Sequence, residues 1–261
     1  MKAAGVWLDR LLVDVKTSVL FCTRLPLSDP TPISGRDLAR ASWALPIAGL
    51  VVGGIGAVVY WAVVWIGLPS WPAAALALAA TVAITGCLHE DGLADTADGF
   101  GGGRDREQKL VIMRDSRLGT YGACALLVSL LLRWSALATI ADAGAVAIAL
   151  VATHAAARAP LPSFMRLVPT ARSDGLAASA GAPSRESATL AWVLGATALL
   201  VGFGFVEAVA GILLLILATA AIAWVSVRQI GGQTGDVVGA LEQVNEVLIL
   251  LTAAVVLNPQ T

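Results

Sequence analysis

The sequence predicts an all-α polytopic membrane protein with about seven transmembrane helices. Of its 261 residues, 57% are hydrophobic and only 13% are charged, whereas ordinary soluble domains carry about 25% charged residues. Apolar stretches near the roughly 20 residues needed to cross a hydrocarbon core of about 30 Å recur along the chain. They lie at residues 41–66, 71–88, 121–141, 143–157, 188–205, 208–227 and 237–257. The fourth is the shortest, and the pattern also allows six or eight spans.

The distribution of basic residues predicts the orientation in the membrane. Of the 17 lysines and arginines, all but Arg133 lie before the first span, between the second and third, between the fourth and fifth, or after the sixth. This alternation follows the positive-inside rule. We therefore expect a multi-pass protein of the cytoplasmic (inner) membrane, with its N-terminus and active site in the cytoplasm and its C-terminus outside. The lipid bilayer is an expected partner and nucleic acid is not.

We interpret residues 1–261 as a single membrane domain that begins with an amphipathic cytoplasmic segment, residues 1–40. Asp9, Asp14 and Lys16 interrupt any early apolar core, so no cleavable signal is evident. One helical face carries Leu8, Leu11, Leu12, Val15 and Val19. It predicts an interfacial helix, and a soluble helix packed on the bundle is an equal alternative. Ser34 and Asp37 have the spacing of a capping box that starts the next helix.

Small residues in the first span predict close helix packing. Gly49, Gly53, Gly54 and Gly56 form a small-residue face of the kind that lets helices approach each other in lipid. Polar chemistry is concentrated instead in the expected cytoplasmic segments. These include an acidic, glycine- and arginine-rich segment at residues 89–120 and a basic loop at residues 158–187, whose length favours a function.

The acidic motif at residues 89–99 (HEDGLADTADG) is the most informative feature of the chain. Asp91, Asp95 and Asp98 stand at positions i, i+4 and i+7, so a helix would align them on one face. Such a face repels itself unless it is neutralised, and Mg²⁺ with phosphate as a co-ligand would relieve the repulsion. The alternative is an acidic loop that only ends a membrane helix. The density of carboxylates at a membrane boundary favours the metal site.

Residues after the acidic motif are suited to phosphate. Gly101 and Gly102 would let backbone amides approach an anion, with Arg104 beside them to neutralise it, although no Walker A pattern follows. Arg114 and Arg117 add guanidinium groups suited to phosphate oxygens.

A glycine-rich turn near the C-terminus includes Thr234 and ends at Asp236, at the start of the last span. We place both residues in the substrate site. A helix N-cap is an equal and compatible role for Asp236.

Arg133, His154 and Arg158 are ionisable residues in or beside apolar spans. Arg133 lies in the middle of the third span, and His154 and Arg158 are one helical turn apart at the end of the fourth. A charge at the centre of a membrane costs about 2.5–3.5 kcal/mol on insertion scales, which favours a functional role. Arg133 is expected to pair with an acid or to face a cavity, and the sequence does not identify its partner.

Four segments together resemble the cobalamin synthase family. They are residues 21–26 (FCTRLP), the acidic motif, residues 112–122 (IMRDSRLGTYG) and residues 231–236 (GGQTGD). The resemblance covers nearly the whole chain. It implies a Mg²⁺-dependent membrane transferase that joins adenosylcobinamide-GDP to α-ribazole or its 5′-phosphate and releases GMP. The sequence does not determine whether the chain forms a homo-oligomer.

The resemblance also implies roles for individual residues. Asp91, Asp95 and Asp98 would hold the metal against the diphosphate. Glu90 and Asp115 are candidates for its outer shell or for the general base. The charge on the phosphates would be stabilised by Arg104, Arg114 and Arg117.

Two other functions compete with this one. Residues 95–99 match the opening Asp-x-x-Asp-Gly of CDP-alcohol phosphotransferases, but the further spaced aspartates of that motif are not complete. A transporter would explain the many spans and the charges within them. Transporters, however, usually place their sites near the bilayer midplane, whereas the acids here cluster at a boundary.

Overall fold

The computed structural model describes residues 2–27, 33–174 and 180–258, and it confirms the all-α prediction. Within these residues no strand forms, and one parallel bridge joins Thr170 to Gln233. The helices are α1 (Lys2–Cys22), α2 (Gly35–Ala41), α3 (Leu45–Trp65), α4 (Ser70–Thr85), α5 (Leu88–Gly102), α6 (Arg106–Ile112), α7 (Thr120–Ile140), α8 (Ala143–Arg158), α9 (Leu161–Leu167), α11 (Arg185–Phe203), α12 (Phe205–Ile230) and α13 (Gly235–Val256).

Six helical segments of the described chain are long and apolar enough to cross a membrane, and a seventh crossing arises if α4 and α5 are counted as one broken span. The chain is therefore a polytopic membrane protein, as the composition predicts. The fourth predicted span, the shortest in the sequence, continues through α9 to Leu167, and it is the most enclosed of the six, with 72% of its apolar window buried.

Glycines bring α3 and α8 into backbone contact. A Cβ atom on Gly49 would lie 2.1 Å from the carbonyl oxygen of His154, and one on Gly53 would lie 2.5 Å from that of Leu150. Only glycine fits at such distances. The predicted small-residue face is thus an interface, with one correction: Gly54 has no atom within 4 Å of its Cβ position and points away.

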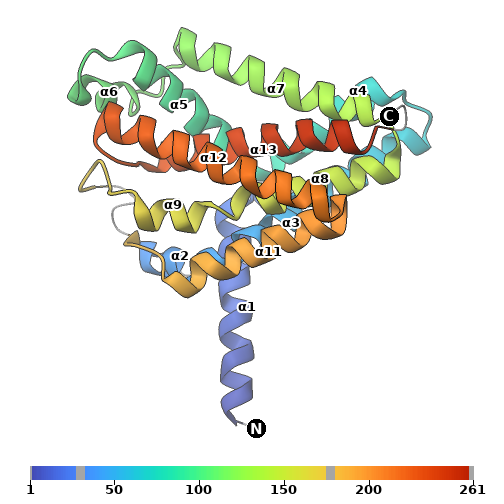
Figure 1. Cartoon of the computed structure of the whole chain (residues 1–261), viewed down its shortest axis with the longest axis horizontal. Coiled ribbons are helices and arrows are strands. Elements are labelled where there is room, and N and C mark those ends of the chain that lie inside the picture. The colour runs from blue at the N-terminus through green and yellow to red at the C-terminus, as the bar shows by residue number, and fades with distance from the viewer. Residues whose placement is uncertain (1, 28–32, 175–179, 259–261) are drawn as a thin grey trace.

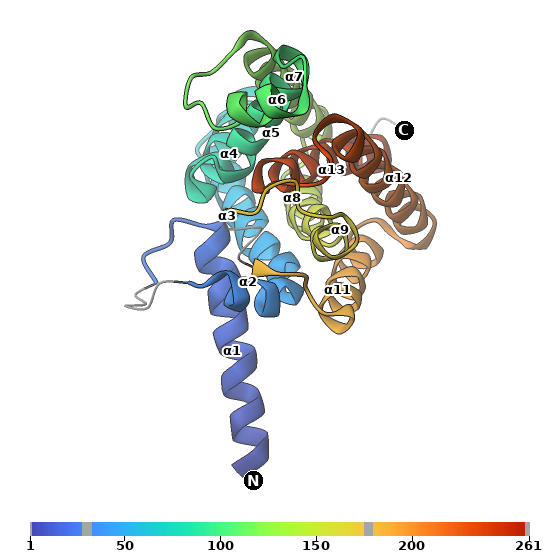
Figure 2. The same cartoon turned by 90° about the vertical axis from the view of Figure 1, so that its left-hand side faces the viewer.

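Helix α1 runs roughly perpendicular to the bundle (Figures 1 and 2). Leu8, Leu11 and Leu12 on its first half are exposed, which favours the interfacial alternative over a helix packed along its whole length. In the second half of α1, Asp14 is buried and accepts hydrogen bonds from Arg40 and Trp43. The predicted capping box at Ser34 and Asp37 is confirmed at the start of α2.

The polar connections gather at one end of the bundle, on the left in Figure 1 and towards the viewer in Figure 2. Residues 158–187 do not form one long loop as predicted, because they include α9 and the bridge to Gln233. Arg106 on α6 joins these segments. Its guanidinium donates to the carbonyl oxygens of Ile230 and Ala171, at 2.8 and 2.6 Å.

Candidate active site

The acidic motif lies on α5, which leaves α4 at an angle of 87°. Gly86 and Cys87 make the turn with positive φ angles of 63° and 60°. A left-handed conformation is ordinary for glycine but costs a residue with a Cβ about 1–2 kcal/mol. The strained Cys87 is the N-cap of α5, so the backbone strain lies directly before the acids, as it often does at functional sites.

Asp91 and Asp95 face a cleft of about 550 Å³, which we call the acidic cleft. Arg114 and Arg117 line the same cleft from the segment between α6 and α7. Asp115 also lines it, and hydrogen bonds from Arg117 hold the pKa of the Asp115 carboxyl below its usual range. Two of the predicted metal ligands and two of the predicted phosphate ligands therefore share one cavity.

Asp98 has a different environment from the other two aspartates. Its carboxylate is buried and accepts hydrogen bonds from the backbone N–H groups of Gly119 (2.7 Å) and Gly122 (2.8 Å). Gly119 is the N-cap of α7 and Gly122 lies in its first turn, where N–H groups have no partner within the helix. Asp98 thus fixes the start of α7 beside α5, and each of its oxygens already accepts one hydrogen bond.

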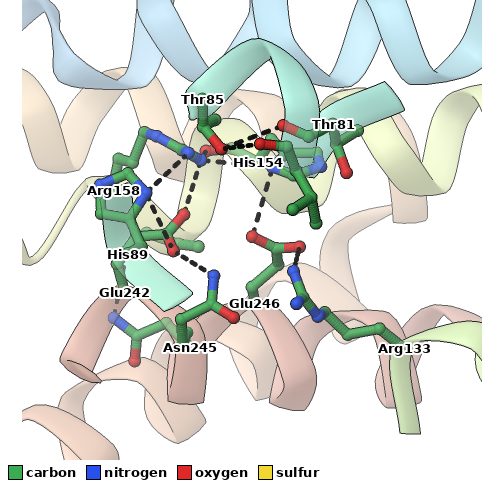
Figure 3. A network of polar contacts seen from close by, with 12 residues as sticks. Thr81, Thr85, His89, Arg133, His154, Arg158, Glu242, Asn245 and Glu246 are labelled. Carbon is green, nitrogen blue, oxygen red and sulfur yellow. Dashed lines mark hydrogen bonds and ion pairs between the residues drawn. The ribbon is translucent and has the colours of Figure 1, made fainter. Parts of the chain in front are cut away.

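Glu90 lines the acidic cleft and also contacts a buried arginine inside the bundle. Arg133 on α7 lies 3.2 Å from Glu90 and 2.8 Å from Glu246 on α13, and all three side chains are buried. This pairing identifies the acidic partners of Arg133 that the sequence did not, and Figure 3 shows the contact with Glu246. A buried arginine needs such partners, because an unpaired charge in this environment is very costly.

A second buried pair lies beside the first. Arg158 on α8 contacts Glu242 on α13 at 2.7 Å, and Glu242 also lies 3.5 Å from His89, the residue before Glu90 (Figure 3). His154, Glu242 and Glu246 bring three possible ligand atoms within 4.8 Å of one another. Both carboxylates are already neutralised by arginines, so we interpret this group, with Arg133, Arg158, His89 and Glu90, as a buried ion network and not as a metal site.

Asp236 approaches α5 from the start of α13. A Cβ atom on Gly92 would lie 2.7 Å from the Asp236 carbonyl oxygen, so the two helices touch at this point. The N-cap of α13 is Thr234, which corrects the N-cap role considered for Asp236. The Thr234 hydroxyl donates to the Asp236 carboxylate, and Arg172 lies 3.8 Å from the same group. Partial burial lowers the pKa of Arg172.

The remaining predicted residues lie further from the acidic cleft. Gly101 and Gly102 form the last turn of α5 instead of a loop, and a Cβ on Gly101 would lie 2.6 Å from the ring of Tyr121. This glycine therefore allows α7 to pack closely. Arg104 is exposed just after the helix and does not line the acidic cleft.

Two more cavities adjoin the site. The basic cleft, an open cavity of about 690 Å³, is lined by Arg106, Arg114 and Arg172. The apolar pocket, about 220 Å³, lies where α1, α5, α9 and α13 meet, and Asp91 and Asp236 are on its wall. Asp91 thus borders both the apolar pocket and the acidic cleft.

Comparison with known families agrees with this geometry. The family model for cobalamin-5-phosphate synthase matches residues 14–254, nearly the whole chain. The chain belongs to this family. Membership favours the first of the three functions weighed from the sequence.

Three relatives each align with nearly the whole chain. The chain is 55% identical over 244 residues to the adenosylcobinamide-GDP ribazoletransferase of Bradyrhizobium diazoefficiens, covering 94% of each protein. It is 55% identical to the protein of that name from Mesorhizobium japonicum, covering 95% of each, and 49% identical to that from Xanthobacter autotrophicus, covering 94% of this chain and 96% of the relative. No solved structure matches the chain.

Sequence reasoning missed four polar residues around the site. Glu242 and Glu246 lie one helical turn apart in the last span, the same signal that drew attention to His154 and Arg158. In the sequence, Arg106 and Arg172 are two of many basic residues between the spans, and Arg172 belongs to the basic loop at residues 158–187. Their hydrogen bonds to backbone carbonyls of distant segments could be found only from the fold.

Proposed function

We propose that this chain is a Mg²⁺-dependent adenosylcobinamide-GDP ribazoletransferase of the cytoplasmic membrane, with the acidic cleft facing the cytoplasm. The reaction joins adenosylcobinamide-GDP to α-ribazole or its 5′-phosphate and releases GMP, the last chemistry of cobalamin formation. The observation that carries the proposal is the acidic cleft, which combines Asp91 and Asp95 with Arg114 and Arg117. Family membership and the names of the relatives support it.

The carboxylates around Asp95 are suited to a Mg²⁺ ion that is also bound by the phosphates of the substrate. Asp91, Asp98 and Asp236 all lie close enough to repel the charge on Asp95, and a cation between them would relieve that repulsion. Within the described residues, the α5 acids do not bring three ligand atoms within 4.8 Å of one another. Mg²⁺ in phosphate chemistry is commonly held by one or two carboxylates plus substrate phosphates, and Asp95 would supply one, which leaves Asp91 for a second role. When bound, the ion would polarise the diphosphate and neutralise charge on it.

The protein's own residues would then position the diphosphate. Arg114 and Arg117 neutralise the negative charge that develops on the phosphate oxygens. The 3′-hydroxyl oxygen of the ribose bonds to the phosphorus nearest cobinamide, the bond from this phosphorus to the bridging oxygen breaks, and GMP leaves. Positioning and charge neutralisation provide most of the rate in reactions of this kind.

Asp91 is our candidate for accepting the hydroxyl proton. It is exposed and lies between the acidic cleft and the apolar pocket. Three other carboxylates are less suitable, because Glu90 is paired with Arg133, Asp98 holds the start of α7, and Asp115 is paired with Arg117.

The direct test uses the full chain purified in detergent. We expect GMP and a cobalamin product when it is supplied with adenosylcobinamide-GDP, α-ribazole and Mg²⁺, and loss of both products with EDTA. Folded protein that makes neither product with Mg²⁺ present would contradict the assignment. Product formation that EDTA does not affect would contradict the metal requirement alone.

A further inference from the structure

The apolar pocket is not used by the phosphate chemistry described above. It lies against the face of α5 that meets α1, α9 and α13, and its wall includes Phe21, Leu45, Leu161 and Met165. Its volume of about 220 Å³ is below the roughly 300–1,000 Å³ of pockets that bury a whole drug-sized ligand. It is therefore large enough for one group of a larger molecule and too small for a whole one.

The apolar pocket has both polar and apolar side chains on its wall, with Ser42 and His89 among the polar ones. Asp91 and Asp236 are on its wall, whereas the residues from α1 and α9 are mainly apolar. An occupant must therefore combine an apolar part with hydrogen-bond donors. A lipid chain offers no donor to the carboxylates, whereas ribose hydroxyls are common partners of acidic side chains.

We propose that the apolar pocket binds the planar, uncharged base of the acceptor nucleoside, with its ribose directed at Asp91 and Asp236. Phe21, which is half-buried on the pocket wall, supplies an aromatic surface for the base. Because Asp91 also borders the acidic cleft, a ribose held there lies beside the diphosphate. The inference rests on the proposed function, since it assigns the second substrate of that reaction to a place in the fold.

Filling the pocket tests this assignment. Met165 is half-buried and lies outside the acidic cleft, so Met165→Trp reduces the volume of the pocket without touching the phosphate ligands. We expect the KM for α-ribazole to rise at least tenfold, and the KM for adenosylcobinamide-GDP to change less than twofold. Met165→Leu keeps the side-chain volume, so it should raise the KM for α-ribazole far less than Met165→Trp does, by less than threefold.

Removing the aromatic surface gives a second test. Phe21→Ala should raise the KM for α-ribazole about fivefold to tenfold, and Phe21→Trp should largely preserve it. Free 5,6-dimethylbenzimidazole should compete with α-ribazole, and should do so more weakly against Met165→Trp. Unchanged KM values in Met165→Trp and Phe21→Ala would overturn the proposal, as would a co-purified phospholipid that Met165→Trp displaces without any kinetic effect.

Failure of the proposed function would be recognised separately. In that case neither the unmodified protein nor any Met165 variant releases GMP. Direct binding of α-ribazole, measured by calorimetry on the detergent-purified chain, still tests the pocket. Binding that Met165→Trp weakens at least tenfold supports it, and binding that is absent or unaffected by the substitution contradicts it.

Discussion

Arg133 on α7 donates a hydrogen bond of 2.8 Å to Glu246 on α13, and the same guanidinium contacts Glu90 on α5 at 3.2 Å. Glu90 precedes Asp91, so this buried charge joins three helices directly behind the acidic cleft. The second pair, Arg158 and Glu242, reaches α5 through His89. The ion network therefore fixes the position and rotation of the helix that carries the acids.

Removing one partner of the network should be costly. Arg133→Met leaves Glu90 and Glu246 buried without their countercharge, and we expect a loss of about 3–5 kcal/mol in the free energy of unfolding. Thermal unfolding in detergent measures this loss. Arg117→Gln is the control, because its exposed pair with Asp115 should contribute little to stability. Equal unfolding temperatures for the two variants would contradict the structural role of Arg133.

The three aspartates of α5 should separate into two classes. Asp98→Asn weakens the hydrogen bonds to Gly119 and Gly122 and should destabilise the protein by about 1–3 kcal/mol. Asp95→Asn should leave stability almost unchanged and abolish GMP release. Measuring the unfolding temperature and turnover of both variants separates the classes. The same loss of stability in both would show that α5 has no such division.

Substitutions at the two residues of the turn between α4 and α5 should have different effects on the stability of the protein. Gly86→Ala places a Cβ in a left-handed conformation, 2.5 Å from the Arg24 Nε, and should cost about 1–2 kcal/mol. Cys87→Gly relieves the same kind of strain but adds freedom to the unfolded chain, so its effect should lie within about 0.5 kcal/mol. Chemical denaturation of both variants tests the pair. A large loss from Cys87→Gly would contradict the assignment of strain.

Asp115 should not control the pH dependence of the reaction. Its pKa is held low by hydrogen bonds from Arg117, so the carboxylate is already ionised at neutral pH. The contribution of this exposed pair to stability is present above the ordinary carboxyl pKa and is lost as the pH falls through the lowered value. Asp115→Asn should therefore leave the acid limb of the pH–rate profile in place. A shift of that limb would instead identify Asp115 as the general base.

Arg172 should determine the response to a 5′-phosphate. It borders the basic cleft, lies 3.8 Å from Asp236, and its Nε is buried without a hydrogen-bond partner. A phosphate oxygen bound there would accept a hydrogen bond from this Nε. We expect Arg172→Gln to raise the KM for α-ribazole 5′-phosphate about tenfold and to change that for α-ribazole less than twofold. Equal changes in the KM values for the two substrates would contradict this role of Arg172.

The sequence predicts the spans and the acidic helix because both depend on local pattern. Apolar length identifies the spans, and the i, i+4, i+7 spacing places the aspartates on one side of α5. The same spacing cannot separate Asp98 from Asp95, because the difference comes from the backbone of α7, about twenty residues away. The partners of Arg133 were hidden for the same reason, since the helix packing that joins α5, α7 and α13 has no local signal.

Turnover of Asp95→Asn as a function of Mg²⁺ concentration tests the central claim most directly, with Asp105→Asn, outside the acidic cleft, as the control. Asp105 is the N-cap of α6, and asparagine retains capping ability. If Asp95 holds the metal against the diphosphate, GMP release falls at least a hundredfold in Asp95→Asn and retains the Mg²⁺ dependence of the unmodified protein in Asp105→Asn. Normal GMP release and an unchanged Mg²⁺ requirement in folded Asp95→Asn would contradict the placement of the active site on α5.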